Sequence, residues 1–199
     1  NGFSSELLHN LDMDEQNLIK RRMNVLGLSY KLMYHHPVEF VRGDGMYLYD
    51  AAGVPYLDCY NNVVSVGHCN ARVAEAVAQQ ISTLNTHTRY LHPAILDYAE
   101  RLLATFPIPL RRVMFACTGS EAVDLALRVA FSHTGADGVI ISEFAYHGTT
   151  MTVSSMSPSL GAAVPLGQHI RTVRAPIAYR AEGEAVGLRL AREVASAID

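Results

Sequence analysis

Three small polar residues, Thr118, Gly119 and Ser120, stand between an apolar run at 113–117 and a helical pattern that begins at Glu121. The first N–H groups of a helix lack partners within the helix, and the helix dipole is positive at that end. Glycine lets a ligand approach the backbone closely, and the two hydroxyls add further donors. This arrangement predicts a binding site for one phosphate group. It matches neither GxxxxGK[ST] nor GxGxxG, which disfavours a nucleoside triphosphate or a dinucleotide.

Thr118 and Glu121 also have the Thr-x-x-Glu spacing of a capping box. Such a box stabilises the start of a helix whether or not a ligand is bound there. The spacing alone does not decide between the cap and the phosphate site.

A second segment shifts the balance toward a ligand site. The apolar run at 139–142 leads into an aromatic, an imidazole and a glycine, Tyr146 to Gly148. Two strands at 113–117 and 139–142 of one parallel sheet would bring both loops to the edge where open α/β sheets bind ligands. We therefore expect a flat ring to stack on Tyr146 while its phosphate binds the Thr-Gly-Ser loop.

The elements that position these loops predict an α/β fold. Hydrophobic periodicity and turn residues predict a sheet whose strands 113–117 and 139–142 are joined by a right-handed helical crossover. We expect two domains, an N-terminal helix and meander segment at 1–69 and the incomplete first part of a large α/β domain at 70–199. The other expected elements are a helix at 13–26, a small antiparallel meander at 38–42, 46–49 and 55–59, helices at 71–84, 93–105 and 121–132, a loop at 154–165, and a final helix at 183–199 with no strand after it.

Composition excludes several classes of protein. The 199 residues are 49% hydrophobic and 18% charged with a net charge of -3, as in ordinary globular domains. This balance gives no reason to expect a nucleic-acid or membrane partner. The three cysteines Cys59, Cys69 and Cys117 are odd in number and scattered, and no basic and apolar leader opens the chain, so we expect a cytoplasmic protein.

Three stretches follow one another in the order YLYDAAGVPYLDCYNNVVSVGHCN, CTGSEAVDLALRVA and AYHGTT, at 47–70, 117–130 and 145–150. Together they closely resemble the class III aminotransferases, pyridoxal-phosphate enzymes of fold type I. The resemblance covers at least residues 50–150. Within the family, CYNNVVSVGHC and LNTHTRYLH are most similar to the ethanolamine-phosphate phospho-lyases and the related alanine:glyoxylate-type transaminases.

The resemblance implies pyridoxal 5'-phosphate as the cofactor. Thr118, Gly119 and Ser120 match the loop that binds the cofactor phosphate. Tyr146 matches the aromatic that stacks on the pyridine ring, and His147 completes the aromatic-His-Gly signature. The family's Schiff-base lysine has no counterpart here, because the only lysines, at 20 and 31, precede the sheet. We therefore expect this chain to be the N-terminal part of a longer enzyme.

The family's chemistry implies action on a primary amine through an external aldimine, in a homodimer. Phosphate elimination from phosphoethanolamine or a similar amino phosphate is the outcome we favour, from the subgroup resemblance. Transfer of the amino group to pyruvate or glyoxylate is the alternative. A non-catalytic module that kept the phosphate site is an alternative of another class.

Two further residues are candidates for the substrate. Arg89 could pair with an anionic group through its planar fork, although arginines near a helix start more often lie at surfaces. Asn61 follows the predicted meander, where asparagine also commonly makes turns. The histidines match no metal-binding spacing, so no metal site is expected.

Overall fold

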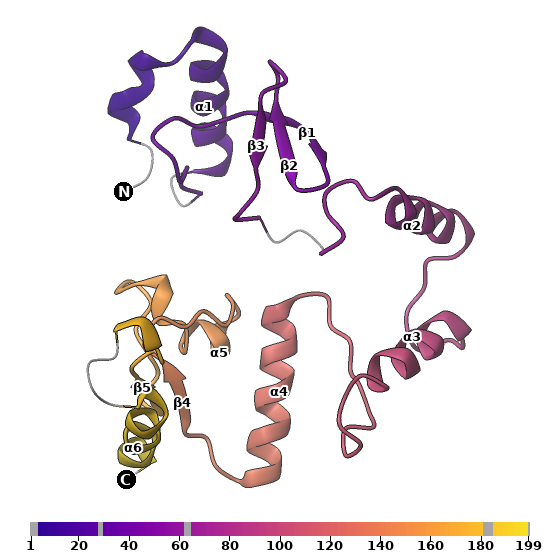
Figure 1. Cartoon of the computed structure of the whole chain (residues 1–199), viewed down its shortest axis with the longest axis vertical. Coiled ribbons are helices and arrows are strands. Elements are labelled where there is room, and N and C mark those ends of the chain that lie inside the picture. Colours follow the sequence, from indigo (N-terminus) through magenta and orange to yellow (C-terminus); the bar gives the residue numbers. More distant parts are fainter. Residues whose placement is uncertain (1–3, 28–29, 62–64, 181–184, 199) are drawn as a thin grey trace. The chain divides into compact units, whose positions relative to one another are not determined.

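The computed structural model describes residues 4–27, 30–61, 65–180 and 185–198. Contacts divide the chain into two compact units, Asn1–Leu91 and His92–Asp199, and the expected domain boundary at 69/70 stays a prediction. In chain order, the elements drawn in Figure 1 are η1 (Ser5–Asn10), α1 (Met13–Leu26), β1 (Phe40–Asp44), β2 (Tyr47–Asp50), β3 (Pro55–Leu57), α2 (Ala71–Thr83), α3 (Pro93–Leu103), α4 (Gly119–Thr134), β4 (Val139–Ser142), α5 (Met151–Ser154), η2 (Pro158–Leu160), β5 (Ile170–Val173), η3 (Ala178–Arg180) and α6 (Val186–Ile198).

The first unit contains the predicted helix and the predicted meander. α1 begins at a capping box between Asp12 and Glu15 and ends at Gly27, whose φ of 68° suits glycine. β1, β2 and β3 form an antiparallel sheet in that order. Both expectations are therefore confirmed.

One carboxylate ties down the chain after the meander. Asp58 accepts hydrogen bonds from the backbone N–H groups of Tyr60 at 3.0 Å and Asn61 at 2.8 Å, and its other oxygen lies 2.7 Å from Nε2 of His68. The Asp58 side chain is only 3% exposed. His68 in turn exchanges backbone hydrogen bonds with Gly45, in the turn between β1 and β2. Both described ends of the segment from 58 to 68 are thus fixed against the sheet.

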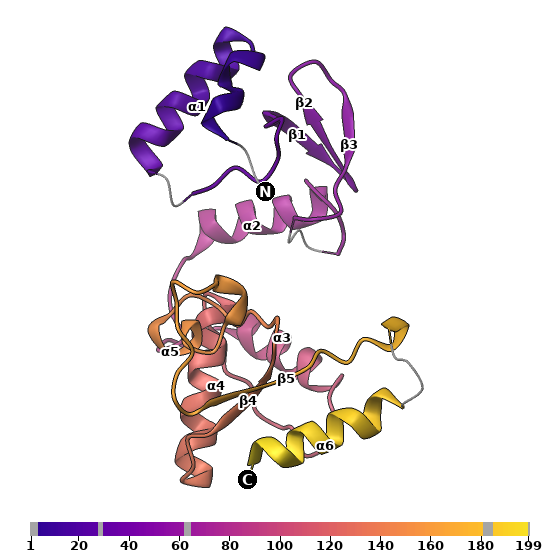
Figure 2. The same ribbon diagram turned by 90° about the vertical axis from the view of Figure 1, so that its left-hand side faces the viewer.

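The second unit is built on a short parallel sheet. β4 pairs with β5 in parallel from Val139 opposite Ile170 to Ser142 opposite Val173. Its buried core is closed on one side by α4, and α6 contacts β5. The views in Figures 1 and 2 show these helices beside the two strands. The buried core residues are Ile141, Val153, Met156 and Ile170, with Val123 and Leu127 of α4 packed against them.

Three expectations about this unit are wrong in detail. Residues 113–117 form no strand, because a strand needs a hydrogen-bonding neighbour and no other described segment pairs with them. β4 pairs instead with β5, a strand that the sequence analysis did not predict. The expected loop at 154–165 contains the end of α5 and the short helix η2. The final helix is confirmed over Val186–Ile198, while residues 183, 184 and 199 lie outside the described part.

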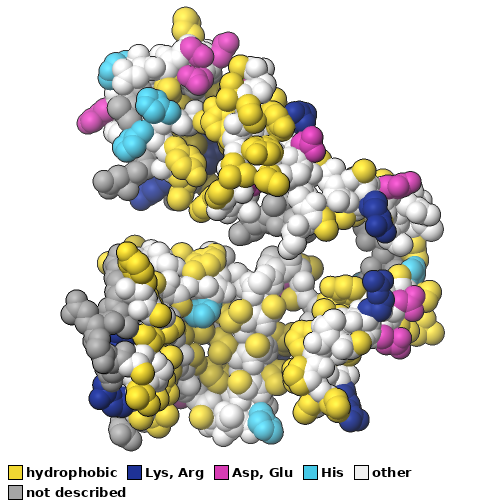
Figure 3. Space-filling view, in the orientation of Figure 1, with side chains coloured by type: hydrophobic (Ala, Val, Ile, Leu, Met, Phe, Trp, Pro, Cys, Tyr) yellow, Lys and Arg dark blue, Asp and Glu magenta, His cyan; other side chains and the backbone are white. Residues whose placement is uncertain are grey.

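Many large apolar side chains are exposed in both units, and Figure 3 shows them on the visible face. In α2, Val73, Val77 and Ile81 repeat at four-residue spacing and are 45%, 51% and 65% exposed. Such a stripe normally faces a partner element. The described residues do not cover it. Within them, no helix combines the length and apolar character needed to cross a bilayer.

The stability that Asp58 provides should disappear in acid. Backbone N–H groups of Asn61 and Tyr60, and then His68, hold the pKa of Asp58 well below its ordinary value. A carboxyl with a lowered pKa in the folded state stabilises that state fully above the ordinary carboxyl pKa and loses the effect progressively as the pH falls from there through the lowered pKa. We expect Asp58→Asn to lower the melting temperature of the full-length protein clearly at about pH 7, nearly as much at about pH 4, and much less at about pH 2, where the pH approaches the lowered pKa of the folded state.

Asp44→Asn is the matched control, because the Asp44 side chain is 72% exposed and lies 3.5 Å from Arg42 in a surface ion pair. Exposed pairs of this kind contribute little to stability. A difference between wild type and Asp58→Asn that stays constant over this pH range would contradict the assignment.

Candidate functional site

The capping box at the start of α4 is present. The Thr118 hydroxyl accepts a hydrogen bond from the Glu121 N–H at 3.1 Å. The Glu121 carboxylate accepts from the N–H groups of Thr118 at 3.0 Å and Cys117 at 2.9 Å. The sequence pattern for a helix cap is therefore confirmed, and the cap itself uses only one N–H of the first turn.

The same helix start keeps four donors available. The backbone N–H groups of Gly119 and Ser120 have no acceptor among the described residues. The hydroxyls of Thr118 and Ser120 each accept one hydrogen bond, and neither donates its proton within the described structure. A β-carbon placed on Gly119 would meet nothing within 4 Å, so the backbone there is open to approach. Two N–H groups and two hydroxyls at a positive helix end suit a phosphate.

The loop after β4 lies directly against this helix start. The Thr149 N–H donates to the Ser120 hydroxyl at 3.1 Å, across 29 residues of sequence. Gly148 has a φ of +133°, and a β-carbon built on it would lie 2.2 Å from the Ser120 Oγ. Only glycine fits this approach. The structure thus brings together the two loops that the sequence placed at one edge.

Tyr146 and His147 lie in this second loop. Tyr146 is 59% exposed, so its ring is accessible in the described structure. The His147 N–H donates to the Ser157 hydroxyl at 2.9 Å, and its Nε2 is buried with no partner among the described residues. An accessible aromatic face and an unpaired buried nitrogen are features expected beside a ligand. Their roles toward a cofactor stay predictions.

Sequence reasoning missed two groups that build this site. Ser157 is fully buried and bonds the second loop, but a serine in a Ser-Pro-Ser segment gives no sign of this. Asp124 lies one turn into α4, where the nearby hydroxyls of Thr150 and Thr152 lower the pKa of its carboxyl. That carboxylate therefore lies on the side of α4 that faces the start of α5. The spacing of Asp124 from the Thr-Gly-Ser loop could have suggested a supporting role.

The two substrate candidates belong to the first unit, and the phosphate donors belong to the second. Asn61 is held by Asp58 through both its backbone N–H and its side-chain amide, at 2.8 and 3.1 Å, as expected for a turn residue. Arg89 is exposed in a turn where its backbone N–H donates to Nδ1 of His87. Neither role toward a substrate is tested by these contacts, and both stay predictions.

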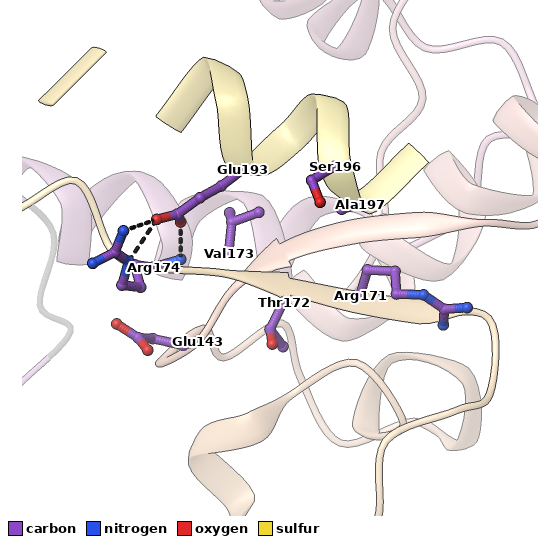
Figure 4. Close-up of a pocket in the computed structure, with 8 residues that line it drawn as sticks. All are labelled: Glu143, Arg171, Thr172, Val173, Arg174, Glu193, Ser196 and Ala197. Atoms are coloured by element: carbon purple, nitrogen blue, oxygen red, sulfur yellow. Dashed lines mark hydrogen bonds and ion pairs between the residues drawn. The ribbon is translucent and has the colours of Figure 1, made fainter. Parts of the chain in front are cut away.

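A pocket between β5 and α6 is a different kind of feature. Figure 4 shows Arg174 turned toward Glu193, while Arg171 points away from that pair. Arg174 bonds Glu193 through its side chain and, at 2.8 Å, through its backbone N–H. Because Arg174 and Glu193 pair with each other, they fasten α6 to the end of β5. None of the predicted site residues lines it.

The cysteines and histidines build no further site in the described residues. Cys59, Cys69 and Cys117 are free and exposed. No three His, Cys, Asp or Glu side chains within the described ranges come together as a metal ion would need.

Comparison with known proteins covers most of the chain. Residues 30–193 match the family described as Aminotransferase class-III. An "Alanine--glyoxylate aminotransferase 2-like" protein of Drosophila melanogaster is 41% identical over 147 residues, 73% of this chain and 30% of that protein. An "Ethanolamine-phosphate phospho-lyase homolog 1" of Caenorhabditis elegans is 38% identical over 145 residues, 72% of this chain and 31% of that protein.

A solved structure is also similar to this chain. A phospholyase from Arthrobacter, solved in complex with phosphoethanolamine, is 42% identical with a TM-score of 0.82. The match covers 91% of this chain and 44% of that one. The expected fold type I architecture is therefore confirmed for the part present. The chain spans about a third of the length of the curated relatives that it matches.

The glycine at 148 provides a sharp test of the loop contact. We expect Gly148→Ala to destabilise the full-length apoprotein by roughly 2–6 kcal/mol, because the β-carbon meets Ser120 and the positive φ is strained. Gly119→Ala is the matched control. Its β-carbon meets nothing, so the free energy of unfolding should change by less than about 1 kcal/mol. Equal effects of the two changes in denaturant unfolding would contradict the close approach.

Proposed function

We propose, because this chain belongs to the class III aminotransferase family, that it forms the phosphate-binding part of a pyridoxal-phosphate enzyme acting on a primary amine. The observation that carries the proposal is the joined pair of loops, with four unused donors on one and an accessible aromatic on the other. A non-catalytic phosphate module would need the first loop alone, and family membership disfavours it.

The residues present fit the phosphate of pyridoxal 5'-phosphate. A phosphate oxygen accepts hydrogen bonds only, and the start of α4 offers N–H groups and hydroxyls with no acceptor of their own among the described residues. In this proposal the N–H groups of Gly119 and Ser120 and the hydroxyls of Thr118 and Ser120 hold the phosphate. The positive end of the α4 dipole favours its negative charge.

The second loop orients the ring. Tyr146 presents its face for stacking, and His147 completes the wall beside it. Pyridoxal phosphate, when bound, supplies an electron sink for a carbanion formed on the amine substrate. The chain's own contribution is to bind the phosphate and fix the plane of the ring.

We favour the phospho-lyase over the transaminase as the finer assignment. The support is the likeness to the Arthrobacter phospholyase in complex with phosphoethanolamine, at 42% identity over 91% of this chain. The transaminase has support of its own, because the protein from Drosophila melanogaster named as an alanine--glyoxylate aminotransferase 2-like protein is 41% identical. The two outcomes would share one site.

We also propose a homodimer, because the exposed apolar stripe of α2 is suited to a partner surface. We propose separately a cytoplasmic location, as expected from the scattered cysteines. Arg89 and Asn61 are proposed to meet the substrate in the whole enzyme, with Arg89 binding its phosphate.

The reaction can be tested without an amino acceptor. We expect the full-length protein, incubated with phosphoethanolamine alone, to release inorganic phosphate, acetaldehyde and ammonia in equal amounts. Elimination of phosphate followed by hydrolysis needs only water, whereas transamination needs an oxo-acid acceptor. The products are measured by a phosphate assay and by reduction of the aldehyde in a coupled assay. Activity that appears only after pyruvate or glyoxylate is added would defeat the phospho-lyase assignment and leave the transaminase.

Arg89→Lys tests the proposed substrate-phosphate contact. Lysine keeps the charge but loses the planar fork that binds two phosphate oxygens at once. We expect KM for phosphoethanolamine to rise roughly tenfold, with cofactor affinity unchanged. Arg101→Lys on α3 is the control and should leave KM unaltered. An unchanged KM in Arg89→Lys would remove Arg89 from the substrate site.

A further inference from the structure

Ser157 occupies an unusual place for a hydroxyl. Its side chain is completely buried, beside the core residues Val153 and Met156. The hydroxyl donates to the Val153 carbonyl at 2.7 Å and accepts from the His147 N–H at 2.9 Å. It also lies 3.4 Å from the carbonyl oxygen of Gly148. One side chain thus joins the core segment to two consecutive residues of the loop that carries Tyr146.

We propose that Ser157 is a positioning residue for the cofactor ring, because it fixes the backbone of His147 and Gly148 against the core. This inference rests on the proposed function, since it assumes that the loop at 146–148 meets pyridoxal phosphate. Ser157 itself touches neither the phosphate donors nor the ring. It acts through the loop.

The loop needs such an anchor because two of its three residues, Tyr146 and Gly148, bury no side chain against the core. Tyr146 is exposed, and Gly148 has no side chain with which to pack. On one side the loop is held by the Thr149 N–H, which bonds Ser120. On the other side the anchors are Ser157, the Ala145 side chain packed against the core, and backbone hydrogen bonds of Ala145 with Ser142 at 3.0 Å and Ser159 at 3.3 Å.

Loss of the Ser157 hydroxyl would leave the His147 N–H without an acceptor. The loop would then gain by turning that donor toward water, away from the α4 start. Because Tyr146 precedes His147 directly, any such movement displaces the aromatic ring. The cofactor would keep its phosphate donors on α4 but lose the fixed surface on which its ring lies.

The test compares Ser157→Ala with Ser155→Ala in the full-length protein. The Ser155 hydroxyl donates only within its own turn, to the Thr152 carbonyl at 2.7 Å, so it is a matched control two residues away. In the apoprotein we expect amide hydrogen exchange at His147 to be roughly tenfold faster in Ser157→Ala than in wild type. In the loaded protein we expect roughly tenfold faster dissociation of pyridoxal phosphate and a shifted absorption band. Ser155→Ala should change neither.

Ser157→Thr keeps the hydroxyl and should restore most of the protection at His147. Should Ser157→Ala fail to fold, the wild-type apoprotein still decides, because an unprotected His147 amide would overturn the proposal. A folded Ser157→Ala protein with wild-type exchange, dissociation rate and spectrum would also overturn it. A wild-type protein that binds no pyridoxal phosphate would defeat the proposed function, while the exchange at His147 would still report on the anchor.

Discussion

The close approach of Gly148 to Ser120 is the contact on which the candidate site depends. A hypothetical β-carbon at 148 would lie 2.2 Å from the Ser120 Oγ, and the Thr149 N–H bonds that same oxygen. The contact joins a helix start, which can bind an anion, to a loop that can bind an aromatic ring. Neither loop alone has the chemistry for a phosphorylated ring. The glycine at 148 lets the two loops lie in contact, so that an anion site and an aromatic surface stand side by side.

The rest of the second unit serves to hold these two loops. α4 is placed by Val123 and Leu127, which pack on the same core that buries Ile141 of β4. β4 leads into the second loop at its carboxyl end. Ser157, which follows α5, bonds both the His147 N–H of that loop and the carbonyl of Val153 in α5. The small core thus sets the relative positions of the two loops. A substitution that loosens this core should disturb the contact between the loops before it unfolds the second unit.

Elements that depend on residues close in sequence, such as capped helices, were predicted correctly. Pairing between strands distant in sequence, such as β4 with β5, was not. The cap at Thr118 defines a helix start through a side chain only three residues away, and it was found where expected. Residues 113–117 have strand composition but no neighbour in the described chain, so composition alone misled. β5 has only four residues, with charged and polar residues between apolar ends, and it is a strand because β4 lies beside it. Ser157 was missed for the same reason, since its partner His147 lies ten residues away.

A helix cap and the proposed phosphate site at Thr118 are compatible, because they would use different atoms. The cap uses the Glu121 N–H and the lone pairs of the Thr118 hydroxyl. The proposed phosphate site would use the N–H groups of Gly119 and Ser120 and the hydroxyl protons of Thr118 and Ser120, none of which the cap uses. The Glu121 carboxylate is itself held by two backbone N–H groups, which lowers the repulsion that it would exert on a bound anion. A stable helix start is therefore a requirement for the anion site, since it fixes the free donors in one direction before any ligand arrives.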